Sequence, residues 1–221
     1  MSKKKYTALI LGSTGLIGTE ILQFLLKNEA YTHVYAVSRQ PISLTDPKLI
    51  PIIADYDSIL PQLEGCTIDH LYCAIGTTKN KVPDETAYYK IDHDYPILVA
   101  SYLKNKGCKT ICIVSSIGAN VQANQFYLKL KGKVEQAIIA LGIPSTFIFR
   151  PSLLMGKRKE KRLLESIAQK VSPLLNIFLR GRLKNYQSIA AHTVASAMVN
   201  LALSNKQGTH IYQTQEIKEN A

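Results

Sequence analysis

The chain has 221 residues, of which 46% are hydrophobic and 19% charged, and its formal net charge is +11. This length favours a single α/β domain, and the composition is typical of a globular protein with an ordinary core. No stretch approaches the roughly 18 consecutive apolar residues that a membrane-spanning helix needs, so no membrane association is expected. The lysine-rich residues 1–5 lead into a short apolar run without a cleavage-like site, which indicates a basic tail and no targeting segment.

The cysteines and the basic residues predict a cytoplasmic protein without a metal site. The four cysteines are few for this length and lie partly in apolar runs, as is typical of reduced thiols in the cytosol. Cys108 and Cys112 have no second cysteine or histidine pair at ligand spacing, which argues against zinc. The basic residues are dispersed except in segments 157–162 and 180–184. This pattern favours solvated surfaces over nucleic-acid binding and leaves the role of the two segments open.

Apolar, β-branched runs alternate with helical patterns along the first 150 residues. The runs predict strands at 6–11, 34–37, 52–54, 71–75, 109–114 and 145–149. Apolar residues at helical spacing predict helices at 15–28, 85–104 and 125–141. No helical pattern follows the second strand, where Pro41, Pro47 and Pro51 instead indicate an extended loop. Strands that alternate with helices form βαβ units, so we expect an α/β fold with a doubly wound parallel Rossmann sheet flanked by helices.

The region after Pro151 has a mostly helical pattern, with one late strand-like run at 210–212. We therefore expect one domain that covers residues 1–221. Its core spans about residues 1–150, and a small, mostly helical C-terminal part at about residues 151–221 faces a substrate or a partner.

Three glycines lie between the first predicted strand and the first predicted helix. Glycine is needed there because the strand must turn sharply, the backbone must approach a pyrophosphate, and the helix must pack close to the sheet. The helix N-terminus adds free N–H groups and partial positive charge. The spacing G-x-x-G-x-x-G differs from the dehydrogenase pattern, but its place in a strand–turn–helix predicts a dinucleotide site. The predicted phosphate-binding residues are Gly12, Ser13, Thr14, Gly15, Leu16, Ile17 and Gly18.

The end of the second predicted strand carries Ser38 and Arg39. NAD-binding folds tend to have an acidic residue at this point, which holds the ribose hydroxyls. A guanidinium can instead make a bidentate contact with a 2′-phosphate, and a serine hydroxyl can support that contact. The two residues therefore favour NADP(H) over NAD(H) as the cofactor, with NAD(H) as the alternative.

Six short motifs occur in a fixed order along the chain. They are residues 12–15, 73–78, 91–95, 114–116, 127–132 and 149–151. The ordered set resembles the atypical branch of the short-chain dehydrogenase/reductase superfamily, and it is similar to the group that includes the HIV-Tat-interacting protein. The resemblance covers about residues 6–202 and implies an NAD(P)-binding Rossmann protein.

The spacing Tyr-x-x-x-Lys occurs twice, at Tyr102/Lys106 and at Tyr127/Lys131. Chance alone gives about one such spacing in a chain with this many tyrosines and lysines. Only the second pair follows the fifth predicted strand and its two serines, as the family pattern requires. We therefore interpret the first pair as a coincidence on the preceding helix.

The resemblance implies a catalytic role for three residues. Four positions apart on a helix, Tyr127 and Lys131 share one face. A free tyrosine has a pKa of about 10, and a nearby ammonium favours the phenolate. Tyr127 would exchange a proton with the substrate oxygen, and Lys131 would hold the ribose hydroxyls and tune the tyrosine. Ser116 would orient the substrate oxygen, with Ser115 as the less favoured candidate.

Other positions carry over from the family to the cofactor and to the late part of the chain. Asp92 stands where members of the family place an asparagine that holds a catalytic water, so the proton relay departs from the family pattern. His192 stands where an aspartate is common. The further residues implied to contact the cofactor are Asp55 and Tyr56 at the adenine, Ala74, Gly76 and Thr77 at the ribose and nicotinamide, and Pro151 against the nicotinamide.

Two classes of function fit this pattern, and a third fits it less well. The first is an NADP(H)-dependent oxidoreductase that acts on a small carbonyl or alcohol substrate. The second is an NADP(H)-binding regulatory or scaffold protein without turnover, whose basic segments dock a protein partner. A nucleotide-sugar epimerase or dehydratase is less favoured because about 70 residues after Pro151 leave little room for its sugar domain. Fold analogy does not choose among them. Pairing through the fourth and fifth helices, as in family members, makes a homodimer possible.

Overall fold

A computed structural model describes residues 4–55, 57–77, 82, 84–155 and 181–221 of the chain. Tyr56 and the basic segment 157–162, which the sequence analysis singled out, lie outside these residues, as does Arg180 of the second basic segment.

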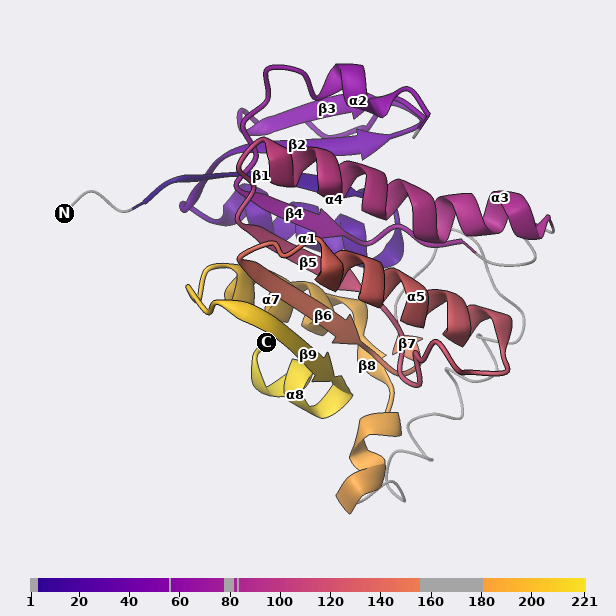
Figure 1. Ribbon diagram of the computed structural model, residues 1–221. Coiled ribbons are helices and arrows are strands. Elements are labelled where there is room, and N and C mark those ends of the chain that lie inside the picture. The colour runs from indigo at the N-terminus through magenta and orange to yellow at the C-terminus, as the bar shows by residue number, and fades with distance from the viewer. Residues whose placement is uncertain (1–3, 56, 78–81, 83, 156–180) are drawn as a thin grey trace.

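Seven parallel strands form one sheet in the order β3-β2-β1-β4-β5-β6-β9 (Figure 1). The predicted doubly wound Rossmann sheet is therefore confirmed. The late strand-like run supplies its seventh strand, which pairs with β6. The strands are β1 (Tyr6–Leu11), β2 (Tyr31–Ser38), β3 (Leu49–Ile53), β4 (His70–Cys73), β5 (Thr110–Val114), β6 (Ser145–Arg150) and β9 (Gly208–Gln213).

Helices cover both faces of the sheet. Figure 1 shows α1 (Leu16–Lys27) and α7 (Ala191–Ala202) on one face, and α4 (Tyr95–Asn105) and α5 (Phe126–Ala140) on the other. Successive residues of a strand point to opposite faces. In β1, Ile10 joins the core under α1 and α7, whereas Leu9 joins the core under α4 and α5. Burial on both faces explains why the strands have continuous apolar sequences.

The strand order reverses between β1 and β4, which lie side by side with Leu11 opposite Cys73. In open α/β sheets, ligands bind in the crevice at the carboxyl ends of the strands where the order reverses. This topology places the candidate site at the ends of β1 and β4, next to the loops that follow β2 and β5.

The helix predicted at 85–104 is three stretches in the structure: α3 (Glu85–Tyr89), a π-helical turn η1 (Lys90–Asp94) and α4. The Asp84 side chain caps α3 by accepting a hydrogen bond from the Ala87 N–H at 2.7 Å. A π-helical turn contains one residue more than an α-helical turn, and such turns are frequent at functional sites. It rotates the side chains of α3 relative to those of α4.

The other differences are at the ends of elements and in short elements. Strand β2 begins at Tyr31 and β4 ends at Cys73, and the predicted absence of a helix between β2 and β3 is confirmed. No described helix is long and apolar enough to cross a membrane. The elements not predicted are α2 (Ile59–Gln62), which contains a proline, the paired strands β7 (Leu154–Met155) and β8 (Ile189–Ala190), the 3-10 helix η2 (Gly181–Tyr186) and α8 (Thr214–Glu219).

Candidate functional site

The glycine loop lies at the switch point, between the end of β1 and the start of α1. Gly12 has a φ of +82°, and a Cβ built on it would lie 2.8 Å from the Ala74 carbonyl carbon after β4. A Cβ on Gly18 would lie 2.0 Å from the Gly12 carbonyl oxygen. Only glycine fits at these positions, because other residues avoid that φ and because the atoms in contact are backbone. The loop therefore has the close packing that a pyrophosphate cradle requires.

The first turn of α1 has no side-chain cap. Gly15 is the N-cap residue, no cap hydrogen bond forms, and no acidic residue lies in this turn. The buried Ser13 hydroxyl donates to the Val37 carbonyl oxygen at 2.7 Å, which ties the loop to β2, while Thr14 is exposed. The N–H groups at the start of the helix, at residues 16–18, thus lack helical partners and can hold a phosphate. The loop fits a dinucleotide through its backbone.

The loops after β2 and β3 form the neighbouring part of the crevice. Arg39 is exposed, and no described residue pairs with its guanidinium. The Ser38 hydroxyl donates to the Gln40 carbonyl oxygen at 2.6 Å and so shapes the turn. One carboxylate oxygen of Asp55 accepts hydrogen bonds from the Ser58 hydroxyl at 2.6 Å and the Ser58 N–H at 3.0 Å. Arg39 is therefore the side chain here that is free to meet an anion.

An ion pair between Lys131 and Asp92 lies beneath the end of β4. Lys131 Nζ lies 3.0 Å from Asp92 Oδ1, and the two side chains are only 7% and 1% exposed. Asp92 Oδ2 accepts a hydrogen bond from the Thr77 N–H at 2.7 Å. Burial is the largest single influence on Lys131 and would lower its pKa, but the charge and hydrogen bond of Asp92, together with Tyr127 and Cys73, raise that pKa above the ordinary lysine range. The lysine is therefore an ammonium at the carboxyl edge of the sheet.

The two Tyr-x-x-x-Lys pairs have similar distances between ammonium and ring but lie at opposite edges of the sheet. Lys131 Nζ lies 5.8 Å from the centre of the Tyr127 ring, and Lys106 Nζ lies 5.7 Å from that of Tyr102. Tyr127 is in the first turn of α5, at the carboxyl edge, and is 39% exposed. Tyr102 is in the last turns of α4, at the amino edge where β5 begins. Position in the fold, and not the spacing, separates the two pairs.

The two serines after β5 have different environments. The Ser115 hydroxyl donates to a carboxylate oxygen of the buried Glu135. Arg150 donates to the same carboxylate through Nε at 2.9 Å and through a terminal nitrogen at 2.5 Å. Ser116 is half-buried, and its hydroxyl makes only a 3.3 Å contact with the next carbonyl oxygen. The Ser116 hydroxyl is therefore the one available to a substrate.

The remaining predicted residues line the same edge. Gly76 is exposed, and Thr77 is half-buried with its carbonyl oxygen accepting from the Tyr88 hydroxyl at 3.2 Å. The Tyr88 ring packs edge-on against Phe126, with 5.6 Å between centroids. Pro151 is buried, and its carbonyl oxygen accepts the Ile117 N–H at 3.0 Å. Aromatic side chains thus flank the place where Tyr127 emerges.

Sequence reasoning missed the partners that hold these residues. It recognised the motif at residues 149–151, which contains Arg150, but not the carboxylate of Glu135, and it noted Asp92 without its lysine. A signal for Glu135 was present, because it follows Lys131 by four positions and therefore lies on the same inward face of α5. The pairing of Lys131 with Asp92 has no sequence signal, because the two residues belong to separate helices.

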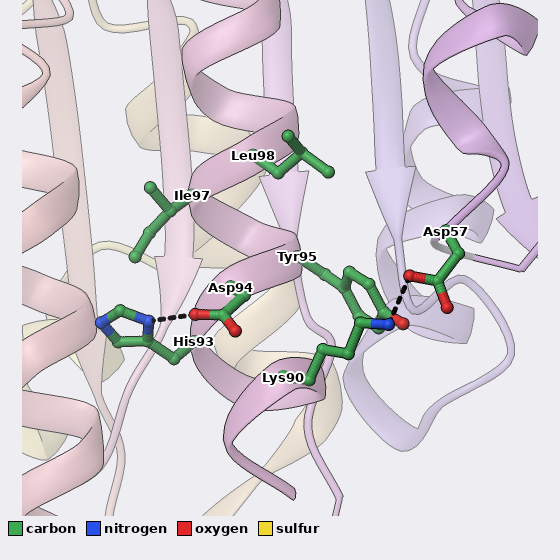
Figure 2. A pocket seen from close by; sticks show the side chains of 7 residues that line it. All are labelled: Asp57, Lys90, His93, Asp94, Tyr95, Ile97 and Leu98. Carbon is green, nitrogen blue, oxygen red and sulfur yellow. Dashed lines mark hydrogen bonds and ion pairs between the residues drawn. The ribbon is translucent and has the colours of Figure 1, made fainter. Parts of the chain in front are cut away.

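A shallow hollow of about 370 Å³ lies on the outside of η1 and α4, with Asp57 from the segment after β3 on its other side. Figure 2 shows Lys90 reaching across it to Asp57, with 2.6 Å between Nζ and the carboxylate, and His93 bonded to its neighbour Asp94. No group of three or more possible metal ligands of the His, Cys, Asp or Glu type occurs among the residues that the structure describes.

Comparison with known proteins decides the family. A family model described as NAD(P)H-binding matches residues 12–205. The chain belongs to this NAD(P)H-binding family. It is 33% identical over 218 residues to the mitochondrial protein FMP52 of Eremothecium gossypii, with 95% of each chain covered. It is 35% identical over 158 residues to FMP52 of Saccharomyces cerevisiae, which covers 70% of this chain and 68% of the relative. These relatives belong to the atypical short-chain dehydrogenase/reductase group, as the sequence motifs predicted.

Solved structures share the fold at low sequence identity. A short-chain dehydrogenase family protein from Francisella tularensis superposes with a TM-score of 0.68 at 17% identity, covering 96% of this chain and 98% of that one. A UDP-N-acetylglucosamine 4-epimerase from Methanobrevibacter ruminantium superposes with a TM-score of 0.71 at 15% identity, covering 98% and 81%. At such identities the likeness concerns the fold and not the substrate.

The cytoplasmic location expected from the sequence is wrong. The relatives of this NAD(P)H-binding protein are named as mitochondrial. The expectation rested on few cysteines in apolar runs. Cys73, Cys108 and Cys112 are buried free thiols. Their packing in the core accounts for their reduced state in any compartment, so they carry no information on location.

Proposed function

We propose that this chain is an NADP(H)-dependent oxidoreductase that interconverts a small carbonyl compound and its alcohol. The proposal is supported by one arrangement: a half-exposed tyrosine, a buried ammonium and an available serine hydroxyl share the carboxyl edge with the glycine loop. These are Tyr127, Lys131 and Ser116. A scaffold that only binds a cofactor needs the loop but has no need for all three groups.

Each side chain has a chemical task in this proposal. A bound nicotinamide supplies or accepts the hydride. Tyr127 Oη gives a proton to the carbonyl oxygen during reduction and takes it back from the alcohol during oxidation. Lys131 donates hydrogen bonds to the ribose hydroxyls and lends positive charge to the tyrosine. The Ser116 hydroxyl donates to the substrate oxygen and orients it.

The proposed preference for NADP(H) rests on Arg39. Arg39 belongs to the loop that follows β2. Its guanidinium is exposed and has no partner among the described residues. A planar guanidinium suits a bidentate contact with the 2′-phosphate, which NAD(H) lacks. Titration of the purified protein with NADPH and NADH, followed by nicotinamide fluorescence, tests this. We expect tighter binding of NADPH, and Arg39→Ala should weaken NADPH much more than NADH. An equal loss for both would assign the 2′-phosphate to another residue.

The catalytic proposal is tested by Tyr127→Phe against a screen of carbonyl compounds. We expect NADPH affinity to stay close to that of the parent while turnover is lost, because only the proton-carrying hydroxyl is removed. Tyr102→Phe is the matched control, since it removes a hydroxyl from the other Tyr–Lys pair and should leave turnover unchanged. Turnover that survives Tyr127→Phe would sink the assigned role. NADPH binding without turnover of any carbonyl would favour the regulatory alternative.

A further inference from the structure

The buried position of Lys131 poses an energetic problem. Its ammonium is 7% exposed, and transfer of a charged amine out of water is costly enough that buried lysines often lose their proton near neutral pH. A neutral amine would hold ribose hydroxyls less strongly than an ammonium. Something in the fold must therefore keep this lysine charged.

Asp92 is held in place independently of the lysine. Its Oδ2 accepts the Thr77 N–H at 2.7 Å, and η1, the π-helical turn that carries it, turns the side chain inward. Its Oδ1 has no hydrogen bond from the described residues and faces only the lysine, at 3.0 Å. Gly76 closes over the pair, because a Cβ there would lie 3.4 Å from Oδ1 and 3.8 Å from Nζ. The carboxylate is a fixed counter-charge.

Two other titratable groups face the lysine, Tyr127 and Cys73, and each raises its pKa by less than the charge of Asp92 does. On α5, the Tyr127 ring lies 5.8 Å from Nζ. On β4, burial raises the pKa of the Cys73 thiol to about 11, so that thiol is neutral under ordinary conditions. Asp92 on η1 is the carboxylate that meets the amine among the described residues.

We propose that Asp92 is a positioning residue that keeps the Lys131 amine protonated and fixed at the carboxyl edge of the sheet, where it holds the cofactor ribose. The part that concerns the ribose rests on the proposed function. The part that concerns the proton does not, because it is a property of the free protein. An asparagine at this position would keep the bond to the Thr77 N–H but would remove the charge.

The test follows the lysine side chains of the free protein by NMR with lysine-selective carbon labelling, across neutral to alkaline pH. The signal of Lys131 is the one that disappears in Lys131→Arg. In Asp92→Asn we expect its titration to move down by about two or more pH units, since a buried amine without a counter-charge loses its proton readily. A Lys131 titration that stays within about half a unit of the parent would overturn the proposal.

Asp57→Asn is the matched control. It makes the same chemical change in the exposed pair with Lys90, where the side chains are 60% and 48% exposed. Water replaces the lost carboxylate there, so we expect the titration of Lys90 to move by less than about half a unit. A shift at Lys90 as large as that at Lys131 would show that burial is not the cause, and would also overturn the proposal.

Two further measurements keep the proposal testable. If Asp92→Asn does not fold, the double variant Asp92→Asn with Lys131→Met removes both charges and should recover folding. Failure to recover would mean that Asp92 acts through something other than the lysine charge. If it folds, its NADPH affinity should match the parent below the new midpoint and fall by about tenfold above it. A parent that binds no NADPH would end the proposed function and leave the NMR result standing.

Discussion

Two Lys–Asp ion pairs on the same π-helical turn lie at opposite depths. Lys90 extends outward from η1 to Asp57 across the hollow in Figure 2, with 2.6 Å between charged atoms and side chains that are 48% and 60% exposed. Asp92 extends inward to Lys131, with 3.0 Å between charged atoms and side chains that are 1% and 7% exposed, respectively. The shorter pair is the one in water, where solvent and salt screen the attraction.

The distance between the charged atoms therefore does not indicate which of the two ion pairs matters more for stability. An exposed pair that loses a partner has water as a substitute, so little changes. A buried pair that loses a partner leaves a charge without solvent, which costs far more than the pair itself contributes. The inner pair is therefore the place where a single substitution has a large effect, and it is also the pair at the candidate site.

The largest expected effect comes from breaking the inner pair from the lysine side. Lys131→Met leaves the buried Asp92 carboxylate without a counter-charge. We expect this to lower the free energy of unfolding by about 3–5 kcal/mol. Lys90→Met makes the same replacement in the outer pair and should leave the denaturation midpoint unchanged. Urea unfolding of both variants measures the contrast. Equal losses in the two variants would mean that depth does not govern the pairs.

A second contrast of depth concerns two histidines. His70, at the start of β4, is 3% exposed, and its Nδ1 lies 2.8 Å from the Tyr31 hydroxyl. The His192 side chain is 69% exposed and pairs with Glu20 at 3.0 Å. Burial lowers the pKa of His70 to about 4, from an ordinary value of 6.5. His70 is therefore neutral in the folded protein over a range where the unfolded chain takes up a proton.

The sign of the resulting pH dependence follows from this shift. Between pH 6.5 and about 4, the unfolded chain binds more protons at His70 than the folded protein does. The contribution of His70 to the free energy of unfolding is therefore fully present above pH 6.5 and is lost as the pH falls toward 4. The loss amounts to something on the order of 3 kcal/mol. His70→Asn keeps a partner for Tyr31 and should flatten this part of the profile of stability against pH. Thermal unfolding measured at several pH values between 4 and 7 tests this prediction. If the melting temperature of His70→Asn fell with pH as steeply as that of the parent, His70 would not be the cause of the pH dependence.

The elements that could be predicted from sequence are those fixed by local chemistry. The strand from Tyr6 to Leu11 shows itself because both of its faces are buried and every residue is apolar or small. Gly12 and Gly18 show themselves because their backbone leaves no room for a Cβ. Ser116, Tyr127 and Lys131 could be picked out because their order along the chain resembles that of the family, and the structure brings all three to one edge.

What could not be predicted depends on contacts between separate elements. The π-helical turn that aims Asp92 inward leaves no trace in a periodicity argument, because one extra residue per turn looks like noise in the apolar spacing. The helical spacing from Lys131 places Glu135 on the inward face of α5, but its partners, Ser115 after β5 and Arg150 at the end of β6, belong to other elements. Such charges are tolerated in the core because their partners arrive from elsewhere in the chain.

The smallest expected effect on the free energy of unfolding concerns two neighbouring serines, one buried and one half-buried. Ser115→Ala removes the hydroxyl that donates to the buried Glu135, whose carboxylate keeps its two bonds to Arg150. We therefore expect a loss of about 1–2 kcal/mol in unfolding free energy, with any turnover retained. Ser116→Ala removes a half-exposed hydroxyl with no strong partner, so it should leave stability unchanged and reduce turnover of an accepted carbonyl. Urea unfolding and steady-state rates on both variants separate the two roles. If Ser115→Ala instead abolished turnover at full stability, the substrate oxygen would have to be assigned to Ser115, and the bond to Glu135 would have to break when substrate binds.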